Sequence, residues 1–394
     1  MLAILLSPPA ARADAQWLPA EPIRLLDGRI RVSAAVTATF GSTDDETFFN
    51  YTDYERNALR TLQASLSGIW QPHERLAFLA DLRSDDLDHL GAYAAYVRVR
   101  PLRGVPLDIQ AGRIPPVFGA FGRRVYQSDR FLIGYPLAYQ YLTSLRADAA
   151  PVTAGDLLRM RGRGWRTSFP VGSPYAGPGL PLISAFRWDT GVQAAWSSAR
   201  IDAALAVTTG TLSNPRLTDD NGEKQIVGRL GVRPTTGLAL GASAARGGWV
   251  ARELPTAGGT PAQSALGADV EYSRDHWLLR SEIVWSRWDV PYVLAPPEGH
   301  AVAALATWIE GRYRLTPRIY VAARADRLGF SRVTGSLPGA VPTPWDAPVR
   351  RVEVGGGYFL QRNLVLRAVA QFNHRDGARE DSRTFLSGQI AWWF

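Results

Sequence analysis

The last eight residues of the chain, "SGQIAWWF" (387–394), decide how the rest of the sequence is interpreted. Apolar and polar residues alternate through this segment, and the period of two is that of an extended strand with unlike faces. The apolar face consists of Leu386, Gly388, Ile390, Trp392 and Phe394, and Ser387 and Gln389 lie on the other face. Chain ends are usually exposed to water, so the question is what environment shields this aromatic face from solvent.

The same alternation recurs along nearly the whole chain, for example in "RIRVSAAVTATF" (29–40), "TLQASLSGIW" (61–70) and "LVLRAVAQFN" (364–373). Each of these segments has one apolar face and one polar or charged face, as expected of a strand between two different environments. Counting such segments predicts sixteen strands, at 29–40, 58–70, 76–84, 92–100, 107–114, 188–197, 201–210, 223–233, 238–247, 265–273, 277–288, 301–315, 317–328, 350–360, 364–374 and 383–394.

The connections between these strands alternate between short and long. The short ones are "QPHE" (71–74), "PLRGVP" (101–106), "SSAR" (197–200), "PTTG" (234–237), "SRDH" (273–276), "TP" (316–317) and "QRN" (361–363). An even number of strands places both chain ends on the side of the short turns. Together these features predict an all-β transmembrane antiparallel barrel with short periplasmic turns and long extracellular loops. Lipid offers no hydrogen bonds, so the last strand must close against the first, and lipid covers its aromatic face.

The polar face of the expected strands carries many charges. A dry protein core would not tolerate them, whereas a water-filled lumen would, which argues against a soluble β-sandwich or barrel. The charges expected to face the lumen are Arg98, Arg100, Glu271, Arg280, Glu282, Glu310, Arg312, Arg314, Arg324, Arg351, Glu353 and Arg367.

Composition excludes several other classes of protein. No apolar run approaches the ~20 residues of a membrane-spanning helix. The chain has no cysteine, which excludes disulfides and thiolate chemistry, and its five histidines show no spacing typical of a metal site. We therefore expect neither a metal nor a cofactor.

The start of the chain, "MLAILLSPPAARADAQ" (1–16), has a short apolar run followed by small residues that fit an A-x-A cleavage rule. A basic n-region is missing, so we interpret residues 1–15 as the remainder of a longer signal peptide and residues 16–28 as a periplasmic segment before a single barrel domain, 29–394. The alternative is an apolar N-terminal tail that is kept.

The end of the chain resembles the C-terminal signature of bacterial outer-membrane proteins, in which a terminal Phe follows apolar or aromatic residues at alternate positions. Phe394, Trp392 and Ile390 match that signature. The resemblance implies a location in the bacterial outer membrane, contact with its lipid and lipopolysaccharide, and recognition by the barrel assembly machinery.

The connection at 115–187 is far longer than an ordinary loop, and such a length usually indicates function. Over residues 29–394 the order of elements resembles the sixteen-stranded general bacterial porins, whose third extracellular loop follows strand five and folds into the channel. Its opening, "GRIPPVFGAFG" (112–122), is similar to a Gly-Arg-x-x-x-Pro-Phe-Gly stretch of phosphate-selective and related porins, with Val117 interposed. The resemblance implies that 115–187 narrows the lumen; the subfamily stays open.

Arginine dominates the charge of this long loop. Folded into a lumen, the excess would make the constriction positive, enrich anions there and offer bidentate partners for carboxylate or phosphate. The alternative for individual arginines is binding to lipopolysaccharide phosphates, or pairing with lumen acids such as Asp108 and Glu310. The loop holds Arg123, Arg124, Arg130, Arg146, Arg159, Arg161, Arg163 and Arg166 against Asp129, Asp148 and Asp156.

Within the loop, residues 135–146 have apolar side chains spaced by four, which predicts a short helix. Its cluster of Tyr135, Tyr139 and Tyr141 would pack the loop against the barrel wall, or else offer a sliding surface for sugars or aromatic solutes.

These features predict a passive porin for small anionic or neutral solutes, and small outward residues (Ala92, Ala94, Ala203 and Gly228) would permit a homotrimer. A barrel sleeve around a partner protein such as an electron conduit is the main alternative. An outer-membrane hydrolase using His89 with Asp86 or Asp88 lacks a supporting motif. Strand one begins too early for an energy-coupled transporter's plug domain, and dispersed arginines argue against nucleic-acid binding.

Overall fold

The computed structural model describes residues 20–44, 49–51, 61–85, 87, 89–185, 188–219, 222–254, 256, 259–291, 301–377 and 381–394, with only the backbone of His89 and Asp381. The expected signal peptide, 1–15, lies outside this part of the chain. Among the described residues, no helix is both long enough and apolar enough to cross a membrane.

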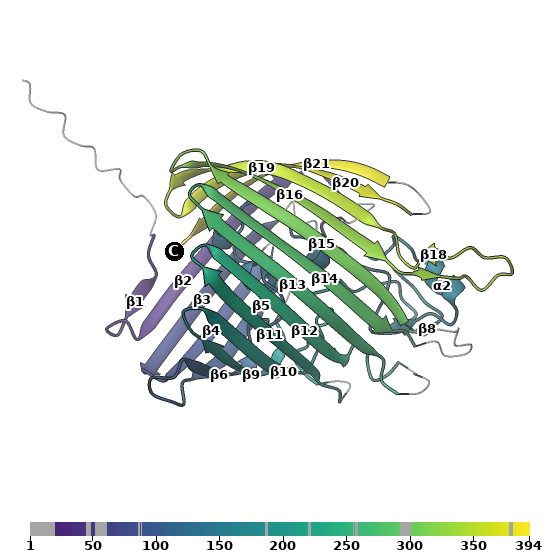
Figure 1. Ribbon diagram of the computed structural model, residues 1–394, viewed down its shortest axis with the longest axis horizontal. Helices are drawn as coiled ribbons and strands as arrows, with labels where there is room; N and C mark the ends of the chain where they lie inside the picture. The colour runs from purple at the N-terminus through teal and green to yellow at the C-terminus, as the bar shows by residue number, and fades with distance from the viewer. Residues whose placement is uncertain are drawn as a thin grey trace, which may run out of the picture.

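Sixteen long antiparallel strands form one closed sheet, so the predicted all-β barrel and its strand count are confirmed. Figure 1 shows the strands strongly tilted, with the chain's C-terminus at one end of the barrel. The strands are β2 (Ile30–Gly41), β3 (Leu62–His73), β4 (Leu76–Asp85), β5 (His89–Val99), β6 (Leu107–Arg113), β9 (Thr190–Ser197), β10 (Ile201–Thr208), β11 (Gln225–Thr235), β12 (Leu238–Gly248), β13 (Ala262–Arg274), β14 (Trp277–Asp289), β15 (Ala301–Arg314), β16 (Ile319–Phe330), β19 (Val349–Gln361), β20 (Leu364–Arg375) and β21 (Asp381–Trp393).

The barrel closes between its first and last long strands. β21 pairs with β2 from Ala35 opposite Trp393 to Gly41 opposite Ser387, and Phe394 exchanges backbone hydrogen bonds with Ala34. The first residues of β2 lie beyond the end of β21, and a short strand, β1 (Ile23–Leu25), pairs with them instead. Both edges of β2 are therefore satisfied along its length, as a sheet in lipid requires.

Alternation places aliphatic side chains outside and polar ones inside. On β14, Trp277, Leu279, Ile283 and Trp285 are exposed on the outer face, whereas Glu282 on the inner face is only 2% exposed. Aromatic rings gather near the short turns, where Trp70 stacks on Phe78 and Trp277 contacts Tyr313. The outer face is thus the one that hydrocarbon would cover, with amphipathic rings near one interface.

One outward assignment from the sequence is wrong. A register shift between β4 and β5 makes Asp81 face Ala94 and Leu82 face Ala92, which leaves Tyr93 as the extra residue of a bulge. Because a bulge changes which residues point inward, Ala94 is buried and cannot contribute to an outer contact surface, whereas Ala92 stays exposed.

The two ends of the barrel differ. The short-turn end carries the turns 74–75, 100–106, 198–200, 236–237, 275–276, 315–318 and 362–363, together with β1 and the C-terminus. The opposite, long-loop end carries the longer connections, including a small pair of strands, β17 (Arg332–Val333) and β18 (Thr343–Pro344). Figure 1 shows β1 and β18 at these opposite ends.

We predict that Gly357→Ala destabilises the barrel. A Cβ at Gly357 would lie 2.4 Å from the Tyr320 ring, whose hydroxyl bonds to the carbonyl of Phe131. Displacing this ring should cost ~1–3 kcal/mol. The measurement is the temperature at which the folded band on an unheated SDS gel converts to the unfolded band. Gly68→Ala is the control, because a Cβ there meets nothing within 4 Å; equal melting of the two variants would contradict the prediction.

Candidate functional site

The connection between β6 and β9 folds into the barrel and forms the candidate site. It contains two 3₁₀ turns, η1 (Phe121–Arg124) and η2 (Gln127–Asp129), and two short helices, α1 (Leu137–Gln140) and α2 (Ala154–Arg159). Two short strands, β7 (Ala149–Ala150) and β8 (Val171–Gly172), pair within it. Most side chains from 130 to 146 are buried, although this segment belongs to a loop. The prediction that the loop folds inward is therefore confirmed.

A glycine sets the course of the loop as it enters the lumen. Gly119 has a φ of +71°, and a Cβ there would lie 2.3 Å from Oε1 of Glu282. Only glycine combines this backbone conformation with such a close approach. As a result, the N–H of Gly119 reaches Oγ of Ser243 at 3.1 Å and the N–H of Ala120 reaches Glu282 at 3.0 Å.

Wall carboxylates hold the loop by its backbone. Besides the N–H of Ala120, Glu282 accepts the hydroxyl of Tyr139 at 2.8 and 2.9 Å. Asp326 accepts the N–H of Leu137 at 3.2 Å, and Glu353 accepts the N–H of Gly134 at 2.9 Å. These carboxylates are buried, so losing a partner would leave a charge desolvated without compensation.

Arginines of the barrel wall also hold the loop, by donating hydrogen bonds to its carbonyl oxygens. Arg324 donates to the carbonyl of Gly134, Arg351 to that of Tyr135, and Arg367 to that of Gln127, at 3.0, 3.1 and 2.7 Å. Arg324 also pairs with Glu310, Asp326 and Glu353. The buried charges around the loop therefore neutralise one another while they fix its backbone.

The loop also contacts the wall across the lumen. The hydroxyl of Tyr126 donates to Asp81 on β4 at 2.6 Å, and the hydroxyl of Tyr93 on β5 donates to the carbonyl of Ala185 at 2.6 Å. The guanidinium of Arg83 lies 3.4 Å from the ring centroid of Tyr93. Because the loop bonds to β4 and β5 as well as to β12–β20, it crosses the interior rather than lining one side.

The predicted helix over 135–146 is wrong beyond its first turn. α1 ends at Gln140, and Tyr141 is already extended. The backbone from 143 to 145 bonds instead to Leu180, on the returning part of the loop, and the N–H of Ser144 bonds to Asp346. Tyr139 and Tyr141 are buried, so these rings pack the loop in place rather than forming a sliding surface.

The structure does not bring the eight loop arginines together. Arg159, Arg161, Arg163 and Arg166 lie on and just after α2, which Figure 1 shows beside β18 at the long-loop end. Arg146 is buried and donates to Asp148, Thr167 and Tyr175 within the loop itself. Arg130 is buried as well and donates to the carbonyl of Ile133. Arg130 and Arg146 therefore stabilise the fold of the loop, and the other four arginines lie at the long-loop end of the barrel.

Arg123 and Arg124 differ from the other six because η1 carries them toward the short-turn end. Arg124 pairs with Glu271, three residues before the end of β13, at 2.6 Å. Arg123 is exposed, and its Nε donates to the carbonyl of Pro116. Enclosure by the barrel lowers the pKa of both, and Arg280 further lowers that of Arg124. Both guanidinium groups nevertheless stay charged at neutral pH, since an arginine pKa lies far above it.

The inner face around these two arginines forms a basic region, which we call the short-turn vestibule. The carboxylates on its strands are paired, Asp108 with Arg100, Asp202 with Arg233, Asp269 with Arg229, and Glu271 with Arg124 and Arg280. Asp129 on η2 lies near Arg124 and Arg280 but forms no ion pair with either. Further vestibule arginines have no carboxylate partner in the described part of the chain: Arg98, Arg123, Arg200, Arg312 and Arg314. The vestibule therefore carries excess positive charge.

The structure places the charges expected in the lumen on the inner face in two groups. Arg98, Arg100, Glu271, Arg280, Arg312 and Arg314 lie in the vestibule, whereas Glu282, Glu310, Arg324, Arg351, Glu353 and Arg367 surround the loop. Asp326, Arg229 and Asp269 also belong to these groups and were absent from the sequence-based set. The same alternation of faces that revealed the others would have found them.

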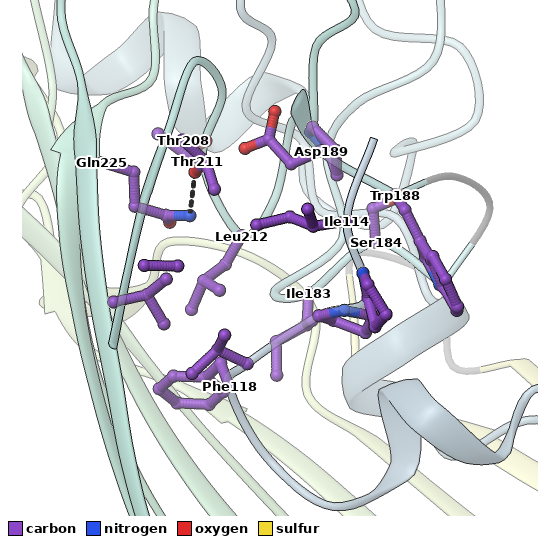
Figure 2. A pocket seen from close by; sticks show the side chains of 16 residues that line it. Ile114, Phe118, Ile183, Ser184, Trp188, Asp189, Thr208, Thr211, Leu212 and Gln225 are labelled. Atoms are coloured by element: carbon purple, nitrogen blue, oxygen red, sulfur yellow. Dashed lines mark hydrogen bonds between the residues drawn. The ribbon is translucent and has the colours of Figure 1, made fainter. Parts of the chain in front are cut away.

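A small cavity lies where the loop leaves and rejoins the wall (Figure 2). Its volume is about 40 Å³, and Ile114, Phe118, Ile183 and Leu212 contribute to a largely apolar lining. Asp189 at its rim accepts the backbone N–H groups of Thr190, Gly210 and Arg216. Burial raises the pKa of Asp189. Such a cavity has room for a few water molecules and is part of the loop's support.

The residues that the sequence suggested for a hydrolase are not among the described side chains. Asp86 and Asp88 lie outside the described residues, as does the side chain of His89. In the part of the chain that is described, no group of three or more His, Cys, Asp or Glu side chains is arranged to hold a metal ion.

Known proteins with this fold are bacterial outer-membrane proteins. The chain is similar to an anion-selective porin from Comamonas acidovorans, with a TM-score of 0.55 and 10% identity over 93% of this chain and 99% of that one. For the trimer form of OmpT, an outer-membrane protein of Vibrio cholerae, the TM-score is 0.55 and the identity is 9%, over 93% of this chain and 99% of that one. For the outer-membrane channel DcaP of Acinetobacter baumannii, the TM-score is 0.52 and the identity is 8%, over 95% of this chain and 100% of that one.

No family model matches the sequence, and no curated protein matches it either. At these identities the likeness establishes the fold, that of the bacterial outer-membrane porins, and leaves the subfamily open. The outer membrane is the location that this fold indicates.

We predict that Glu282→Ala loosens the loop, because Ala120, Tyr139 and the indole of Trp308 all lose their acceptor. Leaving these buried donors unpaired should cost ~1–3 kcal/mol each before relaxation. The measurement is amide hydrogen exchange of residues 119–140 by mass spectrometry, which should become faster. Glu74→Ala, in an exposed turn, is the control. Unchanged exchange in Glu282→Ala would mean that this carboxylate does not hold the loop.

Proposed function

We propose that this chain, which has the sixteen-stranded fold of the bacterial outer-membrane porins, is a passive channel that favours small anions over cations. The observation that supports the proposal is the imbalance of charge in the short-turn vestibule. The vestibule carboxylates on the strands are paired with arginine, while Arg98, Arg123, Arg200, Arg312 and Arg314 have no carboxylate partner in the described part of the chain.

The location of this charge matters as much as its amount. Around the inserted loop, buried arginines and carboxylates neutralise one another, as Arg324 does with Asp326 and Glu353 at 2.9 and 2.7 Å. The uncompensated arginines lie on the periplasmic side of the loop, in an aqueous space walled by low-dielectric protein. Such a space focuses the field and raises the local anion concentration.

Arg123 and Arg124 are the loop residues assigned to selectivity in this proposal. They extend from η1 toward the vestibule, whereas Arg159 and Arg163 belong to the long-loop end. The latter pair, with Arg166, would instead meet lipopolysaccharide phosphates or solutes at the cell surface. The similar porin from Comamonas acidovorans is named as anion-selective, which is consistent with a preference for anions in this fold.

The alternative functions have less support. A sleeve around a partner protein needs an open interior, but here the loop bonds to wall strands from β4 to β20. An outer-membrane hydrolase needs an assembled catalytic group, and its candidate residues lie outside the described side chains. We therefore propose a channel that is not an enzyme.

Assembly follows the same reasoning. We propose a homotrimer, because an OmpT structure is named as a trimer form and because Ala92, Ala203 and Gly228 keep parts of the outer wall flat. We also propose that Phe394, Trp392 and Ile390 are read by the barrel assembly machinery before β21 closes against β2. In the folded state the rings of Trp392 and Phe394 lie 5.3 Å apart.

We predict that Arg123→Glu combined with Arg124→Glu reduces anion preference. The double change reverses two charges on η1, so the ratio of chloride to potassium permeability should fall by ~3-fold or more. The measurement is the reversal potential of single channels in a planar bilayer under a salt gradient.

The matched control is Arg159→Glu combined with Arg163→Glu, which changes the net charge equally at the long-loop end. This control should leave the reversal potential close to that of the wild type. A double variant at 123 and 124 with wild-type selectivity, or a control with the larger effect, would remove η1 from the selective part of the channel.

A further inference from the structure

A cavity of about 630 Å³ opens on the inner face at the short-turn end of the barrel, which the proposed function places in the periplasm. Its wall comes from the β9–β10 turn, the β11–β12 turn and the end of β13, and its polar lining consists of Arg200, Arg233, Thr235, Thr236, Glu271 and Ser273. This volume lies within the ~300–1,000 Å³ range of small-molecule sites.

The charge of this cavity is positive. Arg233 pairs with Asp202 at 2.7 Å, and Arg200 is exposed with no carboxylate partner in the described part of the chain. The single carboxylate in the lining, Glu271, is held by Arg124 at 2.6 Å and by Arg280 at 3.0 Å. Its charge is therefore more than compensated from outside the cavity, and the lining leaves a guanidinium free for a ligand.

The remaining polar lining consists of hydrogen-bond donors. The hydroxyls of Thr235, Thr236 and Ser273 are exposed and make no side-chain hydrogen bond within the described residues. Carboxylate and phosphate oxygens accept from both guanidinium and hydroxyl groups, and arginine matches either group in bidentate geometry. A cation would find no free carboxylate there.

Two glycines lie on β11 and β12, the strands whose turn lines the cavity. Gly231 and Gly241 face each other across β11 and β12. A Cβ at Gly231 would lie 2.5 Å from Oδ2 of Asp202, and one at Gly241 would lie 2.3 Å from a terminal nitrogen of Arg229. A side chain at either position would displace Asp202, which pairs with Arg233, or Arg229, which pairs with Asp269.

We propose that this cavity is a binding site for small oxyanions with more than one carboxylate or phosphate group, which enter it from the periplasm. The proposal deepens the proposed function, since it names the solute class for the same vestibule. It does not require conduction, because the cavity opens at the periplasmic mouth before the inserted loop.

The test is isothermal titration calorimetry on the purified, detergent-solubilised protein, with citrate and pyrophosphate as probes. We expect one site per chain, with affinity that falls as salt is added. Arg200→Ser combined with Arg233→Ser should weaken binding by at least ~10-fold, because both guanidinium groups are lost. The matched control, Arg159→Ser combined with Arg163→Ser, should bind as the wild type does. Tighter binding of citrate assigns carboxylates, and tighter binding of pyrophosphate assigns phosphates.

A second variant guards against a folding defect. Thr236→Val removes one hydroxyl donor from an exposed turn and should weaken binding several-fold without changing the melting of the folded band. The proposal would be overturned if the wild type bound neither citrate nor pyrophosphate. It would also be overturned if the variant that combines Arg200→Ser and Arg233→Ser bound them as tightly as the wild type does. The reversal potential of the same preparations reports on anion preference separately, so the failure of one proposal is distinguishable from the failure of the other.

Discussion

The need to satisfy every backbone polar group in lipid is the constraint on which this structure depends. The pairing of β21 with β2 meets it, and β1 pairs with the part of β2 that β21 does not reach. Once the sheet is closed, alternation sends aliphatic side chains to the hydrocarbon and charges to the interior. The loop, the vestibule and their arginines all depend on that closure.

Inside the barrel, charged side chains either hold the loop or leave net charge in the lumen, and the sequence alone does not distinguish the two roles. Glu282, Asp326 and Glu353 accept backbone N–H groups of the loop and hold it across the lumen. Buried charges of this kind are effective because each has hydrogen-bonded partners, and they are costly when one partner is lost. These buried groups fix the position of the loop and add little net charge to the lumen.

The uncompensated positive charge lies elsewhere, on the short-turn side of the loop. There the carboxylates are outnumbered, and arginines such as Arg98, Arg200 and Arg312 keep an uncompensated charge. The part of the barrel that the loop narrows is therefore separate from the part where arginines outnumber carboxylates. The inserted loop links the two, because η1 places Arg123 and Arg124 at the vestibule.

The sequence by itself determined the barrel, its strands and the inner or outer position of most side chains, because a period of two is a local property of the chain. It also indicated the inserted loop through its length. Only the tertiary structure decided where each loop arginine lies: Arg146 and Arg123 look alike in sequence, yet Arg146 is buried and bonded within the loop, whereas Arg123 is exposed beside the vestibule. The bulge at Tyr93 and the early end of α1 were hidden for the same reason, since both depend on partners distant in the chain. Pairing between distant residues decides where each charge lies, and alternation alone cannot specify it.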